Sequence, residues 1–358
     1  MSAPNPSDSG SARRLVRPAV AALAGYVPGE QPSDPRVVKL NTNENPYPPS
    51  PRVAEAIAAA AGNLHLYPDP DSSALRRAAA RLYGVDPDGV VVGNGSDELL
   101  AMLLRAAVDP GEVVAYPIPT YSLYDTQVAL QGGRSMHFPY PADWSLPEAI
   151  FGCGARVFFI CNPNAPSGTL VPLDAIERLA RENPGSIVVA DEAYVDFCDG
   201  TAVGLVGRVP NLVVLRSFSK SYSLAGLRVG LAMTTPALAA ELLKVKDSYN
   251  LDRLAQAGAL AALEDQAAMR ANVDRVRATR ARLSAELGRL GFRVVPSETN
   301  FVLAYGPGES QEGVARSLKE RGVLVRWFRA LPDALRISVG TDAQVDRLLD
   351  ELHSLVAR

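Results

Sequence analysis

Residues 212–233 read LVVLRSFSKSYSLAGLRVGLAM, two apolar runs on either side of a polar segment. The runs at 212–215 and 229–233 have the continuous apolar character of strands that are covered on both faces of a sheet. Between them lie Ser217, Ser219, Lys220 and Arg228, and hydroxyl groups with a guanidinium can bind a phosphate. The lysine beside them can act as a Schiff-base nucleophile, although a lone lysine is more often a solvated surface residue.

Strands and helices alternate along most of the chain. Further apolar runs lie at 90–92, 113–116, 157–161 and 187–190, and helical patterns lie at 53–61, 73–83, 97–107 and 173–181. This alternation predicts an α/β fold with a mostly parallel sheet. After about residue 250 a long helix near 266–290, two strand pairs and further helices indicate a smaller α+β domain. We expect a disordered tail at 1–12, a segment at 13–40 that joins the small domain, a large domain at 41–255 and the small domain at 256–358.

The composition excludes several classes of protein. The chain has 358 residues, of which 47% are hydrophobic and 21% charged, and its net charge of -3 gives no basic excess for nucleic acid or anionic membranes. The three cysteines have no metal-binding or disulfide spacing, which favours a reducing cytoplasm. There is neither a signal peptide nor an apolar run of the ~20 residues that a membrane helix needs. We therefore expect a cytoplasmic protein that binds small molecules, and neither nucleic acid nor membrane.

A glycine-rich turn, GNGSDE at 93–98, follows the strand at 90–92 and opens a helix. The first turn of a helix offers free N–H groups and the positive end of the helix dipole to an anion, here from the backbone of Ser96 and Asp97. The same motif also fits a plain helix cap by either residue.

Three more motifs place polar or aromatic side chains after strands. Asp191, in VVADEAY at 188–194, can pair with a protonated pyridine nitrogen, and Tyr194 can reach an oxygen on the same ring. Asn162, in CNPNAPSGT at 161–169, is placed for that oxygen, and Tyr121, in PTY at 119–121, can stack on the ring. Each motif alone also fits a cap, a rigid turn or a core aromatic. Together they favour one ligand with a ring and a phosphate.

In this order the motifs GSDE, PTY, NPNxPSG, DEAY and SFSKxxxLAGLR resemble those of the aspartate-aminotransferase-like, fold-type-I enzymes that depend on pyridoxal 5′-phosphate (PLP), over nearly the whole chain. The segments YVPG at 26–29, LNTNENPY at 40–47, YPDP at 67–70, SYNLDR at 248–253, GVLVR at 322–326 and LRISVG at 335–340 narrow the resemblance to histidinol-phosphate aminotransferases. The resemblance implies a large, mostly parallel seven-stranded sheet domain that binds PLP, a smaller α+β domain, and a homodimer.

The resemblance also implies roles for the site residues. Lys220 carries PLP as a Schiff base and moves a proton, Asp191 pairs with the ring nitrogen, and Asn162 and Tyr194 hold the ring oxygen. The full set implied for the cofactor is Ser96, Asp97, Tyr121, Asn162, Asp191, Tyr194, Ser217, Ser219, Lys220 and Arg228, with Tyr67 reaching the phosphate of the other subunit. The set implied for the substrate is Tyr26, Asn43, Arg326 and Arg336.

The implied reaction moves an amino group between L-histidinol phosphate and 2-oxoglutarate, which gives imidazole acetol phosphate and L-glutamate in L-histidine biosynthesis. An aromatic or broad-specificity aminotransferase and a threonine-phosphate decarboxylase stay open as alternatives. A PLP-fold regulator would need a DNA-binding domain, and only about 40 residues precede Asn41. Two positions depart from the pattern: Ser167 stands where threonine is usual, and Ala165 where a second asparagine is common.

Overall fold

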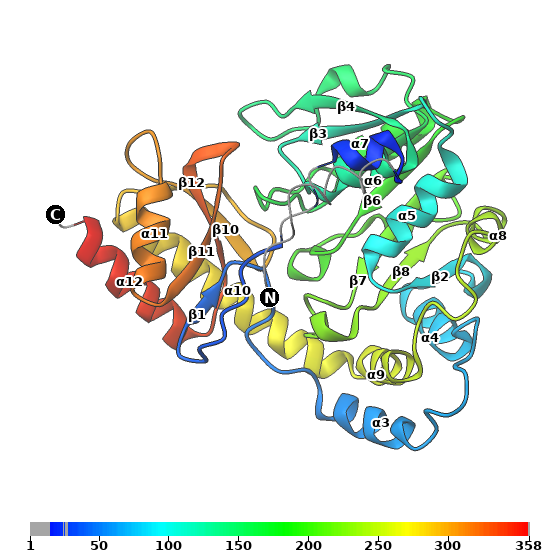
Figure 1. Cartoon of the computed structure of the whole chain (residues 1–358), viewed down its shortest axis with the longest axis horizontal. Helices are drawn as coiled ribbons and strands as arrows, with labels where there is room; N and C mark the ends of the chain where they lie inside the picture. Colours follow the sequence, from blue (N-terminus) through cyan, green and yellow to red (C-terminus); the bar gives the residue numbers. More distant parts are fainter. Residues whose placement is uncertain (1–14, 24, 26–27, 357–358) are drawn as a thin grey trace.

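The computed structural model describes residues 15–23, 25 and 28–356, and these form two sheets (Figure 1). The larger sheet has seven strands in the order β2-β8-β7-β6-β5-β3-β4, and β8 alone runs antiparallel to its neighbours. Its strands are β2 (Val90–Gly93), β3 (Val113–Ile118), β4 (Arg134–Pro139), β5 (Val157–Cys161), β6 (Ile187–Asp191), β7 (Leu212–Ser217) and β8 (Gly230–Met233). This confirms the expected α/β fold with a mostly parallel seven-stranded sheet.

Helices cover both faces of the larger sheet because its central strands are mostly apolar and their side chains are buried on both faces. In β5, Phe158 and Ile160 pack into one core, whereas Phe159 and Cys161 pack into another, since successive side chains of a strand point to opposite faces. The first core is closed by α3 (Pro51–Ala61), α4 (Ser73–Tyr83), α7 (Leu173–Glu182) and α9 (Arg253–Glu264). The second is closed by α5 (Ser96–Ala107), α6 (Leu123–Gln131) and α8 (Pro236–Leu243).

The smaller sheet has five strands in the order β1-β11-β12-β10-β9. They are β1 (Val38–Leu40), β9 (Arg293–Val294), β10 (Phe301–Tyr305), β11 (Val323–Phe328) and β12 (Leu331–Ser338), and β1 pairs in parallel with β11 although it comes from the start of the chain (Figure 1). Leu335 and Ile337 pack under α10 (Gln266–Arg289), α11 (Glu312–Glu320) and α12 (Asp342–Val356). The side chain between them, that of Arg336, therefore lies on the other face.

The remaining elements are short. They are α2 (Pro18–Ala22), η1 (Pro87–Gly89), η2 (Glu148–Ile150), η3 (Val195–Phe197), η4 (Ala202–Leu205) and η5 (Ala225–Leu227). The expected disordered tail at 1–12 lies outside the described residues, and the division at residues 255 and 256 stays a prediction.

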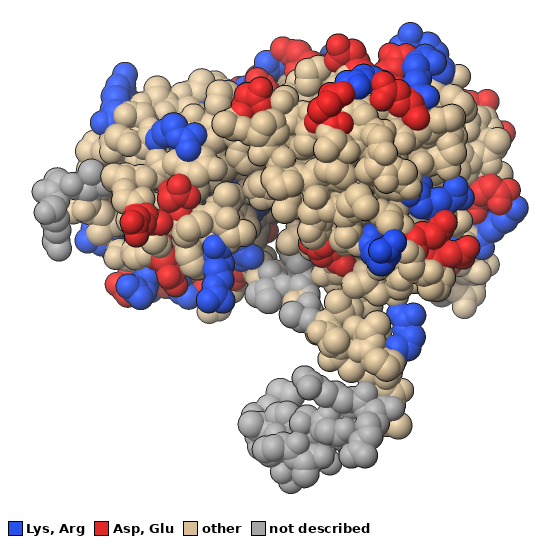
Figure 2. Space-filling view, turned by 90° about the horizontal axis from the view of Figure 1, so that it is seen from above, with Lys and Arg blue, Asp and Glu red and all other residues tan. Residues whose placement is uncertain are grey.

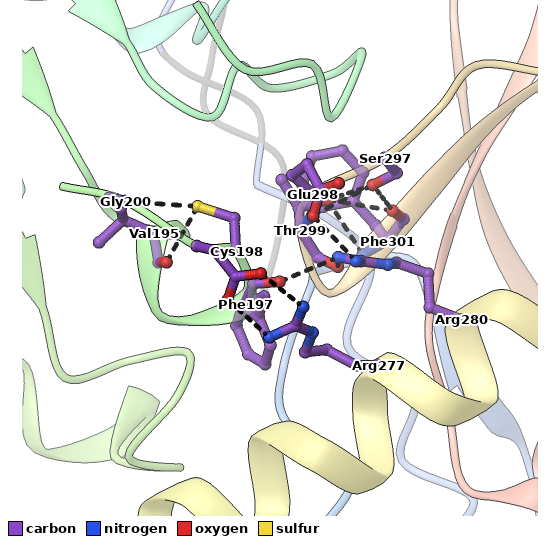
Figure 3. Close-up of polar contacts among 11 residues, drawn as sticks. Val195, Phe197, Cys198, Gly200, Arg277, Arg280, Ser297, Glu298, Thr299 and Phe301 are labelled. Atoms are coloured by element: carbon purple, nitrogen blue, oxygen red, sulfur yellow. Dashed lines mark hydrogen bonds and ion pairs between the residues drawn. The ribbon is translucent and has the colours of Figure 1, made fainter. Parts of the chain in front are cut away.

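Arginines of α10 connect the two sheets. Arg280 donates hydrogen bonds to the carbonyl oxygens of Thr299, just before β10, and of Phe197, in η3 after β6, over 2.8 and 3.3 Å (Figure 3). Arg277, one turn earlier, forms an ion pair with Asp199 at 3.1 Å. The segment that follows β6 is therefore connected to helix α10, which packs on the smaller sheet, by a hydrogen bond and an ion pair.

The surface carries charges of both signs. On the face seen in Figure 2, lysine and arginine side chains alternate with aspartate and glutamate over both parts of the molecule. No described helix combines the length and the apolar character needed to cross a membrane. Within the described ranges, no group of histidine, cysteine, aspartate and glutamate side chains has the arrangement of a metal site.

Candidate active site

A cavity of about 400 Å³ lies between the carboxyl ends of the larger sheet and the helix-free face of the smaller sheet. Parallel sheets bind ligands at this edge, because the strand ends and helix starts converge there. Most of the residues expected from the sequence line the cavity: Asn43, Ser96, Asp97, Tyr121, Asp191, Tyr194, Ser217, Ser219, Lys220, Arg228, Arg326 and Arg336.

One end of the cavity is a cradle for an anion. Helix α5 begins at Ser96, and the preceding Gly95 has a φ of 81° that favours glycine. A Cβ atom on Gly95 would lie 2.6 Å from Nη2 of Arg228. That guanidinium donates to Oδ2 of Asp97 over 3.2 Å and to Oγ of Ser219 over 3.3 Å. The helix start, the guanidinium and the buried serine meet around a space of the kind that binds phosphate groups.

Asp191 ends β6 in the wall of the cavity, and its two carboxylate oxygens differ. Oδ2 accepts a hydrogen bond of 2.7 Å from the hydroxyl of Tyr124. Oδ1 is buried and has no hydrogen-bond partner among the described residues. Burial raises the pKa of Asp191 to about 6. The hydrogen bond from Tyr124 lowers this pKa, whereas the negative charge of Asp97 raises it. A buried carboxylate oxygen without a donor is suited to a ligand N–H group.

Lys220 is half-buried at the centre of the cavity. Burial lowers the pKa of its amine to about 8, and the charge of Arg336 lowers it further, while Glu44 acts in the opposite direction. The backbone carbonyl of Lys220 accepts a hydrogen bond of 3.0 Å from the side chain of Asn45. A lysine with a lowered pKa has more of the neutral amine that attacks carbonyl groups.

Tyr194 and Asn43 form a hydrogen-bonded pair beside Lys220. The amide of Asn43 donates to the Tyr194 hydroxyl over 3.0 Å, and the hydroxyl of Ser338 donates to Oδ1 of Asn43 over 3.1 Å. Burial raises the pKa of Tyr194 to about 12, so its hydroxyl keeps its proton. Because Tyr194 already accepts from Asn43, its own proton can be donated to a ligand in the cavity.

The opposite wall carries two arginines. Arg326 on β11 and Arg336 on β12 are direct partners in the antiparallel register, and both line the cavity. Their guanidinium carbons lie 5.4 and 5.2 Å from the ring centre of Phe328. Arg336 also donates to the carbonyl oxygen of Asn41 over 3.1 Å. Two guanidinium groups on one wall of a cavity are suited to an anionic group of a ligand.

Comparisons with known proteins identify the family. The family model "Aminotransferase class I and II" matches residues 35–352. A histidinol-phosphate aminotransferase of Geotalea daltonii is 47% identical over 93% of this chain and 97% of its own length, and that of Syntrophotalea carbinolica is 48% identical over 94% and 98%. The chain belongs to the class I and II aminotransferases, among the histidinol-phosphate aminotransferases.

A solved structure extends the similarity to the fold and the cofactor. The histidinol-phosphate aminotransferase from Sinorhizobium meliloti, in complex with pyridoxal 5′-phosphate, has a TM-score of 0.87 and 28% identity, with 96% of this chain and 97% of that chain covered. PLP is the cofactor of the family, and the residues present in this aminotransferase fit it. The Gly95–Arg228 cradle fits the phosphate, Oδ1 of Asp191 fits the protonated ring nitrogen, and Lys220 lines the same cavity.

The structure does not place Asn162 among the residues that line the cavity. Its amide nitrogen donates to the carbonyl oxygen of Val171 over 3.1 Å, and its amide oxygen accepts from the Val171 N–H over 2.7 Å. An amide nitrogen carries two hydrogens, so the expected role of Asn162 at the ring oxygen stays a prediction. The residue of this loop that does line the cavity is Ala165.

Two further expected residues are not at this cavity. Tyr67 is 76% exposed and stacks on Tyr249, with ring centres 4.4 Å apart. It does not line the cavity of its own chain, so its expected role depends on a second subunit. Tyr26 lies outside the described residues.

The sequence reasoning missed two residues that act on the site. Tyr124 binds Asp191 from inside the core, and Asn45 holds the backbone of Lys220. A tyrosine within an apolar helix face looks like any core aromatic, so Tyr124 has no separate signal. Asn45 does have one, because it belongs to a run of polar residues, NEN at 43–45, that lies next to Pro46.

Proposed function

We propose that this aminotransferase moves the amino group between L-histidinol phosphate and 2-oxoglutarate, which gives imidazole acetol phosphate and L-glutamate in L-histidine biosynthesis. The names of relatives that are 47% and 48% identical support this assignment. The observation that carries it is the pairing of Arg326 with Arg336 in the cavity that also contains Lys220.

The two arginines match what both substrates have in common. Histidinol phosphate ends in a phosphate, and 2-oxoglutarate has a second carboxylate at a comparable distance from the reacting carbon. The planar guanidinium fork binds phosphate and carboxylate alike through paired hydrogen bonds. One subsite can therefore hold either substrate in its half of the reaction.

The chemistry is divided between the cofactor and the protein. PLP supplies the aldehyde that takes up the amino group and the ring that withdraws electrons from the reacting carbon. In this proposal Lys220 holds PLP covalently, and its Nζ then moves a proton to and from the substrate α-carbon. Asp191 keeps the ring nitrogen protonated, while Tyr194 donates to the ring oxygen and Tyr121 stacks on the ring.

The phosphate of PLP is assigned to the cradle at the start of α5. Its proposed donors are the backbone amides of Ser96 and Asp97 and the side chains of Ser217, Ser219 and Arg228. The buried serines and the approach that Gly95 allows support this assignment.

We also propose a cytoplasmic homodimer in which Tyr67 of each chain reaches the phosphate in the other. Leu64, Leu66, Tyr67 and Tyr249 are 60, 54, 76 and 47% exposed, which supports an interface there. The three cysteines are free thiols, as expected in a reducing compartment. Light scattering of the purified enzyme tests the dimer, because a monomer mass at micromolar concentration would exclude it.

The substrate assignment is tested by competition between acceptors. With L-glutamate as donor, we expect kcat/KM for imidazole acetol phosphate to exceed that for phenylpyruvate by about 100-fold, because phenylpyruvate leaves the two arginines without an anion. A Lys220→Ala variant serves as the control and should show no turnover of either. A higher value for phenylpyruvate would identify an aromatic aminotransferase, and carbon dioxide release from O-phospho-L-threonine would identify a decarboxylase.

A further inference from the structure

Beneath the cavity, Asp191 is supported by a single side-chain donor that does not itself line the cavity. The hydroxyl of Tyr124, on α6, donates to Oδ2 of Asp191 over 2.7 Å. Tyr124 has no exposed surface, and Asp191 is 3% exposed. The carboxylate thus binds the protein with one oxygen, while the other, Oδ1, lacks a partner among the described residues.

Aromatic rings fix Tyr124 from three sides. Its ring centre lies 4.8 Å from that of Phe159, and 5.6 Å from those of both Tyr116 and Tyr121, in edge-on contacts with the two tyrosines. A ring held in this way cannot swing its hydroxyl away from Asp191. Tyr121 is the residue assigned to stack on PLP, so one packed cluster supports both the face and the nitrogen of the ring.

The hydroxyl of Tyr124 keeps its proton at neutral pH and remains a donor there. Burial, and then the charge of Asp191, raise the pKa of Tyr124 well above its usual value. The titratable groups that face Asp191 are Tyr124, Cys161 on β5, Asp97 on α5 and Tyr194. Asp97 disfavours the charged carboxylate, and Tyr124 is the side chain that favours it through a hydrogen bond.

We propose that Tyr124 is a positioning residue of the transamination reaction, which keeps the Asp191 carboxylate ionised and directs its Oδ1 at the ring nitrogen of PLP. The proposal rests on the function assigned above to Asp191. Tyr124 touches neither cofactor nor substrate in this scheme and acts through Asp191.

The substitution Tyr124→Phe removes the hydroxyl and keeps the ring. Without the donor, the pKa of Asp191 rises above its present value of about 6, so a larger part of the carboxyl is neutral at pH 7. We expect PLP to bind the apoenzyme about tenfold more weakly at pH 7, since a hydrogen bond to a charged group is lost. The fall in PLP affinity on acidification should also begin at a higher pH than in the wild type.

Tyr116→Phe is the matched control. Tyr116 is also buried and packs against Tyr124, but its hydroxyl binds Asp125 and Ser135 and not Asp191. Its removal should change PLP affinity less than twofold and leave the pH profile in place. Equal effects of the two substitutions would show that packing, and not the hydrogen bond to Asp191, matters, and would overturn the proposal.

A double-mutant cycle decides whether Tyr124 acts through Asp191. PLP affinity is measured by absorbance titration of the apoenzymes of the wild type, Tyr124→Phe, Asp191→Asn and the double variant. We expect Tyr124→Phe to have no further effect when Asp191 is already replaced, whereas an undiminished effect there contradicts the proposal. If Asp191→Asn itself binds PLP normally, the assignment of Asp191 is wrong. If Asp191→Asn binds PLP more weakly but Tyr124→Phe binds it as the wild type does, only the inference about Tyr124 fails.

Discussion

The cavity has two walls that differ in how their side chains are arranged. On the larger-sheet side, neighbouring residues hold the side chains of the cofactor wall, which consists of Ser96, Asp97, Asp191, Ser219, Lys220 and Arg228. On the smaller-sheet side, two positive charges lie opposite each other in the substrate wall, which consists of Arg326, Phe328 and Arg336. Asp191 is held by Tyr124, and Arg228 by Asp97 and Ser219. Such a wall is ordered in advance for one permanent ligand. The substrate wall places two guanidinium groups side by side, and Arg336 also donates to the carbonyl oxygen of Asn41 over 3.1 Å. In the proposed reaction these groups serve two anionic substrates in turn.

The cofactor wall also rests on buried ions. Arg216, 6% exposed, pairs with Glu192 at 3.2 Å and with Asp196, and Asp196 in turn accepts a hydrogen bond from the hydroxyl of Ser221. Ser221 follows Lys220 directly. The loop that carries the reactive lysine is therefore bound to a charge network in the interior.

The largest expected effect comes from breaking this network. Glu192→Ala leaves Arg216 with one of its two acidic partners in a buried position, and we expect the free energy of unfolding to fall by about 3 kcal/mol. Urea denaturation followed by circular dichroism measures the change. Glu148→Ala is the control, because its ion pair with Arg178 is exposed and screened by solvent, so its loss should change the free energy of unfolding far less. Similar losses in both variants would show that the buried ions do not set the cofactor wall apart.

The substrate wall should respond in activity and not in stability. Arg336→Lys keeps the charge but loses the planar fork, so we expect kcat/KM to fall about 100-fold for both imidazole acetol phosphate and 2-oxoglutarate. The free energy of unfolding should change by less than about 0.5 kcal/mol. Arg329→Lys, at an exposed position in the same hairpin, is the control. A loss confined to one of the two substrates would mean that the anions bind at different places.

The cofactor wall could be predicted from the sequence because its residues follow strands within a few positions. Asp191 closes β6, Lys220 comes soon after β7, and Ser96 opens α5 after β2, so local motifs were enough. The substrate wall could not be predicted in this way. Arg326 and Arg336 were expected only from the resemblance, since their meeting depends on the register of β11 and β12.

The limits of the sequence also have physical causes. Asn162 and Ala165 belong to one loop, and the sequence does not show which side chain lines the cavity. Ala165 lines it, at a position where the sequence departs from the family pattern, whereas the Asn162 amide bonds the backbone of Val171 and its expected role stays a prediction. Strand β4 was missed because its sequence RSMHFP is partly exposed at the edge of the sheet and lacks an apolar run.

Lys220 belongs to the cofactor wall, but its pKa depends on charges from both walls. Because that pKa is lowered from 10.5 to about 8, the neutral amine increases with pH, reaches one half near pH 8 and is nearly complete above about pH 9. The rate at which the apoenzyme captures PLP, followed by stopped-flow absorbance, should therefore rise about tenfold per pH unit from about pH 6 to 7 and level off above about pH 9.

Two variants test this dependence in opposite directions. Arg336→Gln removes a positive charge, which raises the pKa of Lys220 and moves the plateau of the capture rate to higher pH. Glu44→Gln removes a negative charge and moves the plateau to lower pH. Shifts of opposite sign would show that Arg336 of the substrate wall, together with Glu44, sets the pKa of the Lys220 amine in the cofactor wall. A capture rate that still rises steeply at about pH 10 in all three proteins would mean that neither burial nor these charges lower the pKa of the amine, and the two walls would then be electrostatically independent.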